Sequence, residues 1–167
     1  MPTRGALTLF HVRGIRIGVD YSWFFVLFLI IIGMSGFYAD VLGVPSNSAQ
    51  PYLLAVISAL TFFGSILLHE LGHAFVAVRR GIGISDITLW MFGGVATMSR
   101  DSDSPGTEFK IAIAGPLVTL AIAIVFIAIG TAAAGWSELS NVIRFQVPAS
   151  RSGLIAMVAW LASINLY

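Results

Sequence analysis

One segment of the sequence has residue types and spacing that could do chemistry: His69-Glu70-Leu71-Gly72-His73. On a helix, residues four apart share a face, so His69 and His73 can point their imidazole nitrogens at one cation. Glu70, at the neighbouring position, can reach a water beside that cation. The spacing predicts a zinc site in which the metal activates water and Glu70 acts as general base and acid, which is the chemistry of amide hydrolysis.

These residues lie in a chain with the composition of a membrane protein. Of its 167 residues, 57% are hydrophobic and 10% are charged, whereas soluble domains carry about 25% charged residues. The mean hydropathy is +0.92. The formal net charge of +1 gives no reason to expect a nucleic-acid partner. The sequence has no cysteine, so a metal must be bound by histidine and carboxylate side chains.

Four long apolar runs predict transmembrane helices, with the His-Glu-x-x-His segment deep in the second. The expected spans are residues 21–39, 52–78, 111–135 and 153–167. The last run has 15 residues, fewer than the roughly 20 that cross the hydrocarbon. We therefore expect residues 1–167 to form a single membrane-embedded core that is incomplete at its C-terminus. The first run is too long for the apolar core of a signal peptide, which favours an uncleaved anchor.

The basic residues predict the orientation of these spans in a multi-pass protein of the cell membrane. Three precede the first span (Arg4, Arg13, Arg16), four separate the second and third (Arg79, Arg80, Arg100, Lys110), and two separate the third and fourth (Arg144, Arg151). The positive-inside rule therefore places the N-terminus in the cytoplasm.

A change of pattern after the second span predicts a β element. β-branched and aromatic residues flank a Gly93-Gly94 pair, which is typical of a small hairpin or re-entrant strand pair, although a loop on the membrane surface remains an alternative. An exposed strand edge could hold an unwound transmembrane substrate, so Phe92, Gly93, Gly94 and Val95 are candidate substrate-binding residues. The fold expected is an all-α membrane protein of about four helices with this small β element.

Other interpretations of the polar segment stay open at this point. The two histidines could be structural, each bonded to a neighbouring helix or to water, or they could join Glu70 in a proton relay of a transporter. Function of some kind is favoured, because an ionisable group at membrane depth costs on the order of 3 kcal/mol. For Gly115-Pro116, near the start of the third span, close helix packing is favoured over a chemical role.

With these residues identified, the chain resembles the site-2 protease family of intramembrane zinc metalloproteases. The resemblance runs from Gly14-Ile15-Arg16-Ile17 through HELGHAFVAVRRGI from His69 and LWMFGGVATM from Leu89 to EFKIAIAGPLV from Glu108, in the family's order. It implies that His69 and His73 are zinc ligands and that Glu70 is the catalytic carboxylate. It also implies transmembrane protein substrates, cut within the bilayer to release a regulatory factor.

One feature of the family is missing from the sequence. Family members take a third zinc ligand from an Asp in a Leu-Asp-Gly motif, and no such motif is present. The resemblance therefore implies that the third ligand lies beyond Tyr167, so we expect the 167-residue chain alone to bind zinc weakly and to be inactive. Two rival functions are a zinc-binding membrane transporter and a proteolytically inactive relative that only binds membrane partners.

Overall fold

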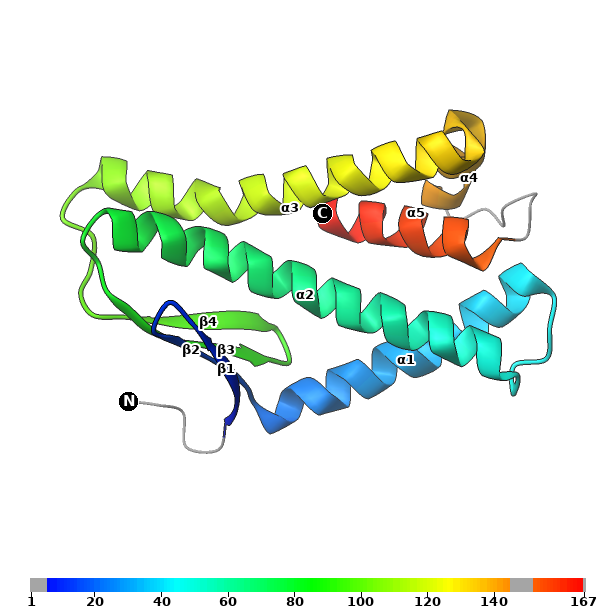
Figure 1. Cartoon of the computed structure of the whole chain (residues 1–167), viewed down its shortest axis with the longest axis horizontal. Helices are drawn as coiled ribbons and strands as arrows, with labels where there is room; N and C mark the ends of the chain where they lie inside the picture. Colours follow the sequence, from blue (N-terminus) through cyan, green and yellow to red (C-terminus); the bar gives the residue numbers. More distant parts are fainter. Residues whose placement is uncertain (1–5, 145–151, 167) are drawn as a thin grey trace. The chain divides into compact units, whose positions relative to one another are not determined.

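A computed structural model describes residues 6–144 and 152–166. Arg4 and Arg151, which entered the charge count, and Tyr167, the last residue of the expected fourth span, lie outside the described residues. The elements in chain order are β1 (Leu7–Val12), β2 (Ile15–Val19), α1 (Tyr21–Leu42), α2 (Ala49–Arg79), β3 (Ile84–Trp90), β4 (Gly93–Met98), α3 (Pro105–Ala134), α4 (Trp136–Ile143) and α5 (Gly153–Leu166), as Figure 1 shows.

Three of the described helices, α1, α2 and α3, are long and apolar enough to cross a membrane. The first two contain the expected spans 21–39 and 52–78, and α3 covers the third span except its last residue, Gly135. All three helices extend beyond the apolar runs at one end or both. The fourth run forms α5, an apolar helix of 14 residues that is too short to count among them. The protein is therefore mostly helical with three candidate membrane spans, and a count of four stays a prediction.

Local signals in the sequence account for the helix ends. Asp20 caps α1 by accepting hydrogen bonds from the Ser22 hydroxyl and backbone N–H at 2.6 and 2.9 Å, and these bonds lower the pKa of the Asp20 carboxyl. Ser104 accepts from the backbone N–H of Thr107 and caps α3, so this helix begins before the apolar run. Gly81, with φ +76°, is the left-handed residue that ends α2.

The expectation of an all-α chain with one hairpin is wrong in one respect, because the sheet has four strands. The predicted hairpin exists as the antiparallel pair β3–β4. The N-terminal residues add a second hairpin, β1–β2, and β2 pairs with β3 in parallel to give the order β1-β2-β3-β4. Apolar residues alternate along Ile15–Val19, which is the local signal for β2. Its pairing with a strand nearly 70 residues later has no local signal.

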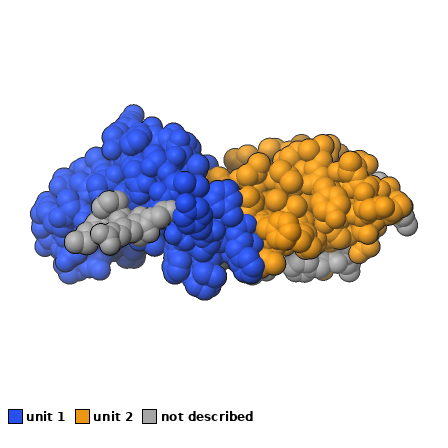
Figure 2. All heavy atoms as spheres, turned by 90° about the horizontal axis from the view of Figure 1, so that it is seen from below, with its two compact units in different colours: residues 1–26, 66–119 blue, residues 27–65, 120–167 orange. Residues whose placement is uncertain are grey.

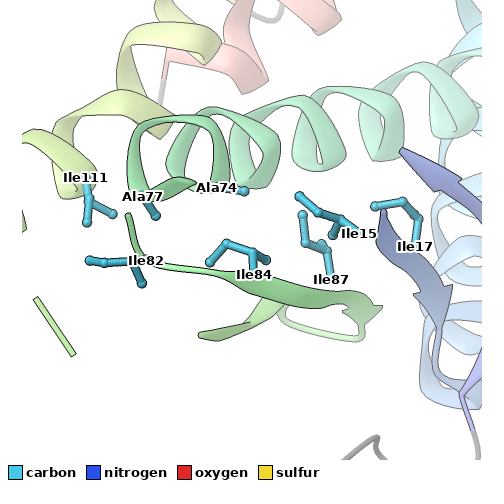
Figure 3. Packing of buried hydrophobic residues seen from close by; sticks show 8 residues of the cluster. All are labelled: Ile15, Ile17, Ala74, Ala77, Ile82, Ile84, Ile87 and Ile111. Atoms are coloured by element: carbon cyan, nitrogen blue, oxygen red, sulfur yellow. The ribbon is translucent and has the colours of Figure 1, made fainter. Parts of the chain in front are cut away.

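The described chain divides into two compact units (Figure 2). One comprises residues 1–26 and 66–119 and contains the sheet, the C-terminal part of α2 and the N-terminal part of α3. In its core, isoleucines of β2 and β3 pack against Ala74 and Ala77 of α2, and Ile111 of α3 joins them (Figure 3). The small alanines let the sheet approach the helix closely, so strand and helix positions are fixed together.

The opposite face of the sheet is polar and holds an ion pair. Arg16 and Asp86 are register partners on β2 and β3, and Arg16 Nε donates to Asp86 Oδ1 at 2.5 Å. Thr88 donates to the other carboxylate oxygen at 2.7 Å. This pair fixes the parallel register of β2 and β3, because a slip by one residue would bury each charge alone.

The other unit comprises residues 27–65 and 120–167. Its core gathers apolar residues from α1, α2, α4 and α5, with Tyr38, Leu139 and Ala156 fully buried. The Tyr38 hydroxyl lies 2.6 Å from that of Ser58, so the one polar group of this buried ring is hydrogen-bonded. The candidate chemistry lies in the first unit.

Candidate metal centre

The two candidate ligands converge on one point beside α2. The Nε2 atoms of His69 and His73 lie 3.0 Å apart. Their ring centroids are 4.7 Å apart and the rings are nearly perpendicular. A single cation held by both nitrogens at the usual zinc distance of about 2.0 Å requires a close pair of this kind. The helical spacing thus produces the convergence that the sequence predicts.

A backbone carbonyl of α3 orients His73. Its Nδ1 lies 2.6 Å from the carbonyl oxygen of Ile111. A carbonyl oxygen can only accept a hydrogen bond, so Nδ1 carries the proton and Nε2 of the neutral ring carries the lone pair. Metal-binding histidines commonly have a partner of this kind, which fixes the ring and its tautomer. His73 is therefore already prepared to bind a metal through Nε2.

Gly115 of α3 keeps the space at the two nitrogens free of side chains. A Cβ at this position would overlap Nε2 of His73 and would lie 2.6 Å from Nε2 of His69. The space left by Gly115 thus adjoins both donor atoms, so this residue contributes to the site as well as to helix packing. The two helices also approach closely at the adjoining residues, where a Cβ on Gly72 would lie 2.9 Å from Val118 and 3.0 Å from the Ala114 carbonyl oxygen.

Gly94 of β4 lies against the side chain of Glu70. A Cβ on Gly94 would overlap the Glu70 Cγ and would lie 2.7 Å from its carboxyl carbon. Any larger residue in this register would displace the carboxylate. The strand therefore brings its backbone next to the carboxylate.

The four candidate substrate-binding residues take different places on β4 and its turn. The sheet order leaves β4 at an edge among the described strands. Phe92 lies in the turn before β4 with 77% of its surface exposed, and Gly93 has φ +135°. Val95 lines a pocket on the polar face of the sheet with Asp86 and Thr88. Gly94 lies closest to the candidate catalytic residue Glu70 where a Cβ is considered, whereas a Cβ on Gly93 would meet nothing within 4 Å.

The described residues fit zinc in part. Two imidazole nitrogens are donors that zinc prefers, and the ring of His73 is held in place. Gly115 leaves space beside both nitrogens, and Glu70 follows His69 directly on the helix. Within residues 6–144 and 152–166, no group of three His, Cys, Asp or Glu side chains stands close enough to hold a metal. A third protein ligand is therefore absent from the described part of the chain.

Sequence reasoning missed the Ile111 carbonyl and understated Gly115. A backbone acceptor has no signal in residue types, because every residue carries one. Gly115 stands out in the sequence because it precedes Pro116, but small residues at helix contacts are common. Its position beside the two histidines depends on how α2 and α3 pack, which the sequence does not show.

The structure thus places two converging imidazoles and a carboxylate on one apolar helix, with the carboxylate beside β4. The chain matches Peptidase family M50 over residues 57–167. Together with the relatives below, this match shows that the chain belongs to family M50, the site-2 protease family.

Two relatives carry the name "Putative zinc metalloprotease". That of Synechocystis sp., sll0528, is 39% identical over 119 residues, covering 71% of this chain and 31% of the relative. Rip3 of Mycobacterium tuberculosis is 31% identical over 163 residues, covering 98% of this chain and 38% of the relative. The chain thus spans about a third of the length of these curated relatives.

A solved structure has the same fold. The site-2 protease from Methanocaldococcus jannaschii matches with a TM-score of 0.60 and 28% sequence identity, over 96% of this chain and 62% of that chain. The likeness of this structure therefore agrees with the family assignment.

Proposed function

We propose that this chain carries the zinc-binding and proton-transferring part of an intramembrane endopeptidase that cuts transmembrane proteins. The observation that supports it best is the joint placement of three groups: the Nε2 atoms of His69 and His73, 3.0 Å apart, and the Glu70 side chain against Gly94. A transporter relay needs the ionisable groups but has no need of a strand edge beside the carboxylate.

His69 and His73 would hold the zinc through Nε2, with a third protein ligand from outside the described residues. When bound, zinc supplies a Lewis acid that makes water a nucleophile near neutral pH and stabilises negative charge on the carbonyl oxygen. The Ile111 carbonyl keeps the His73 ring and its proton in place during turnover.

Glu70 would move the protons of the reaction. Its carboxylate takes a proton from the attacking water and then delivers it to the leaving amine, so one group serves as base and acid. Gly94 leaves room for the carboxylate and brings the backbone of β4 beside it. A peptide pairing with the free edge of β4 would be extended, with its carbonyls exposed to attack.

The membrane setting defines the substrate class. His73 lies six residues before Arg79 on α2, which corresponds to about 9 Å of helix. The site would then lie within the bilayer near its cytoplasmic side, with the N-terminus cytoplasmic. A transmembrane helix hides its peptide bonds in its own hydrogen bonds, so substrates would unwind before pairing with β4.

The test uses the full-length gene product reconstituted in liposomes with a library of single-span peptides. We expect fragments cut within the span, and we expect the chelator 1,10-phenanthroline to abolish them and added zinc to restore them. Metal-dependent flux of an ion without any peptide cleavage would instead support the transporter.

A further inference from the structure

A groove of about 510 Å³ is lined by residues of the C-terminal end of α2 and the first turns of α3, within one unit of the structure. Figure 1 shows these two helix ends at the left of the view. Its floor is apolar and is formed by Val76, Ile113 and Leu117. Its rim carries three cations, Arg79, Arg80 and Lys110. Among the described residues, no carboxylate lines it.

The charge of this rim is not balanced by the described part of the protein. The ion pairs found among residues 6–144 and 152–166 join Arg16 to Asp86 and Arg100 to Asp103, and neither includes a rim residue. Arg79 instead stacks on Phe75, with its guanidinium carbon 4.2 Å from the ring centroid. Three cations around one apolar groove attract a ligand that carries a negatively charged group.

The floor of the groove indicates what the rest of that ligand is. Ile113 and Leu117 are 39% and 54% exposed on α3, a candidate membrane span. The groove therefore runs from a cationic rim at the helix ends onto a surface suited to hydrocarbon. Phospholipid head groups lie at the ends of membrane-spanning helices, and basic pockets between such helices are suited to anionic head groups.

We propose that the groove binds an anionic glycerophospholipid, with its head group at Arg80 and Lys110 and an acyl chain along Leu117. The lipid would contact both α2 and α3, the helices whose close approach at Gly72 and Ala114 holds the metal centre together. Its binding would stabilise this pair of helices. The proposal does not depend on peptidase activity.

The test measures lipid retention and thermal stability of the full-length gene product in detergent. The protein is titrated with phosphatidylglycerol or with phosphatidylcholine, and bound lipid is counted by native mass spectrometry. We expect phosphatidylglycerol to bind at least tenfold more tightly and to raise the melting temperature. In Arg80→Gln/Lys110→Gln its affinity should fall about thirtyfold, the scale expected for two cations near a membrane surface.

Matched variants distinguish a specific lipid site in the groove from a general effect of the protein's positive charge. Arg13→Asn/Arg100→Gln removes the same charge outside the groove and should leave the affinity for phosphatidylglycerol unchanged. Arg80→Lys/Lys110→Arg keeps both positive charges in the groove and should retain the affinity of the unmodified protein. Leu117→Ser should weaken phosphatidylglycerol binding without affecting inorganic phosphate. Equal binding of the two lipids, an equal loss in the matched control, or displacement of the lipid by millimolar inorganic phosphate or by a polyglutamate peptide would overturn the proposal.

Discussion

His73 donates through Nδ1 to the carbonyl oxygen of Ile111 at 2.6 Å, so a backbone group of α3 sets the tautomer of a candidate ligand on α2. The same contact joins the two helices that enclose the metal centre. Ligand orientation and helix packing are therefore coupled at one residue.

This coupling can be separated by substitution at His73. Asn places an amide donor close to the position of Nδ1 and lacks the outer nitrogen, so His73→Asn should lose zinc but keep the bond to Ile111. His73→Ala should lose both and should be less stable than His73→Asn by about 1 kcal/mol, the net value of one hydrogen bond. Zinc content and thermal unfolding in detergent measure the two effects. Equal stability of the two variants would show that the bond to Ile111 contributes nothing.

Gly115→Ala tests the space beside the donor atoms. The added methyl group would overlap the Nε2 atoms, so the histidines must turn away and zinc affinity should fall at least tenfold. Gly106→Ala on the same helix is the matched control, because a Cβ there meets nothing within 4 Å. Isothermal titration with zinc distinguishes the two variants. Undiminished affinity in Gly115→Ala would mean that the space is not used by a metal.

Gly94→Ala should affect Glu70 and spare the ligands. Its methyl group would displace the carboxylate of Glu70, whose atoms are the three nearest to it. We expect the full-length gene product to keep its zinc and to lose cleavage at least a hundredfold, since a displaced base is costly for catalysis. Gly64→Ala, where a Cβ meets nothing within 4 Å, serves as control. Loss of zinc in Gly94→Ala would argue that β4 supports the metal instead.

The ion pair on the polar face of the sheet should matter for folding. Side chains of Arg16 and Asp86 are 21% and 11% exposed, and removing one partner of a largely buried pair costs on the order of 3 kcal/mol. Asp86→Ala should therefore lower thermal stability strongly. Asp103→Ala, which breaks an exposed pair with Arg100, should cost less than about 1 kcal/mol. Equal effects in a melting experiment would contradict the register role of the inner pair.

The sequence predicts those parts of the molecule whose signals are local. Histidines four apart on an apolar helix converge wherever that helix forms, and the Gly93-Gly94 pair marks a hairpin. The parallel pairing of β2 with β3 and the contact of Gly94 with Glu70 depend on how distant segments pack. This packing involves Ala74 and Ala77 of α2 and the isoleucines of the sheet that contact them. Apolar side chains of this kind suit many arrangements equally well, so their sequence does not predict which one forms.

The place of Ile111 illustrates the same limit at the site itself. The sequence places Ile111 at the start of an apolar run, yet the atom that contacts His73 is its carbonyl oxygen, which the residue type does not encode. The third zinc ligand is a different matter, because no described residue supplies one. We expect the 167-residue chain to bind zinc more weakly than a centre with three protein ligands.

The most direct test of the central claim compares Glu70→Gln with His69→Ala in the full-length gene product, measuring zinc per chain by elemental analysis and cleavage of a reconstituted single-span substrate. The account predicts that Glu70→Gln retains the zinc content of the unmodified protein without detectable cleavage, and that His69→Ala loses both. Cleavage at an undiminished rate by Glu70→Gln would contradict it.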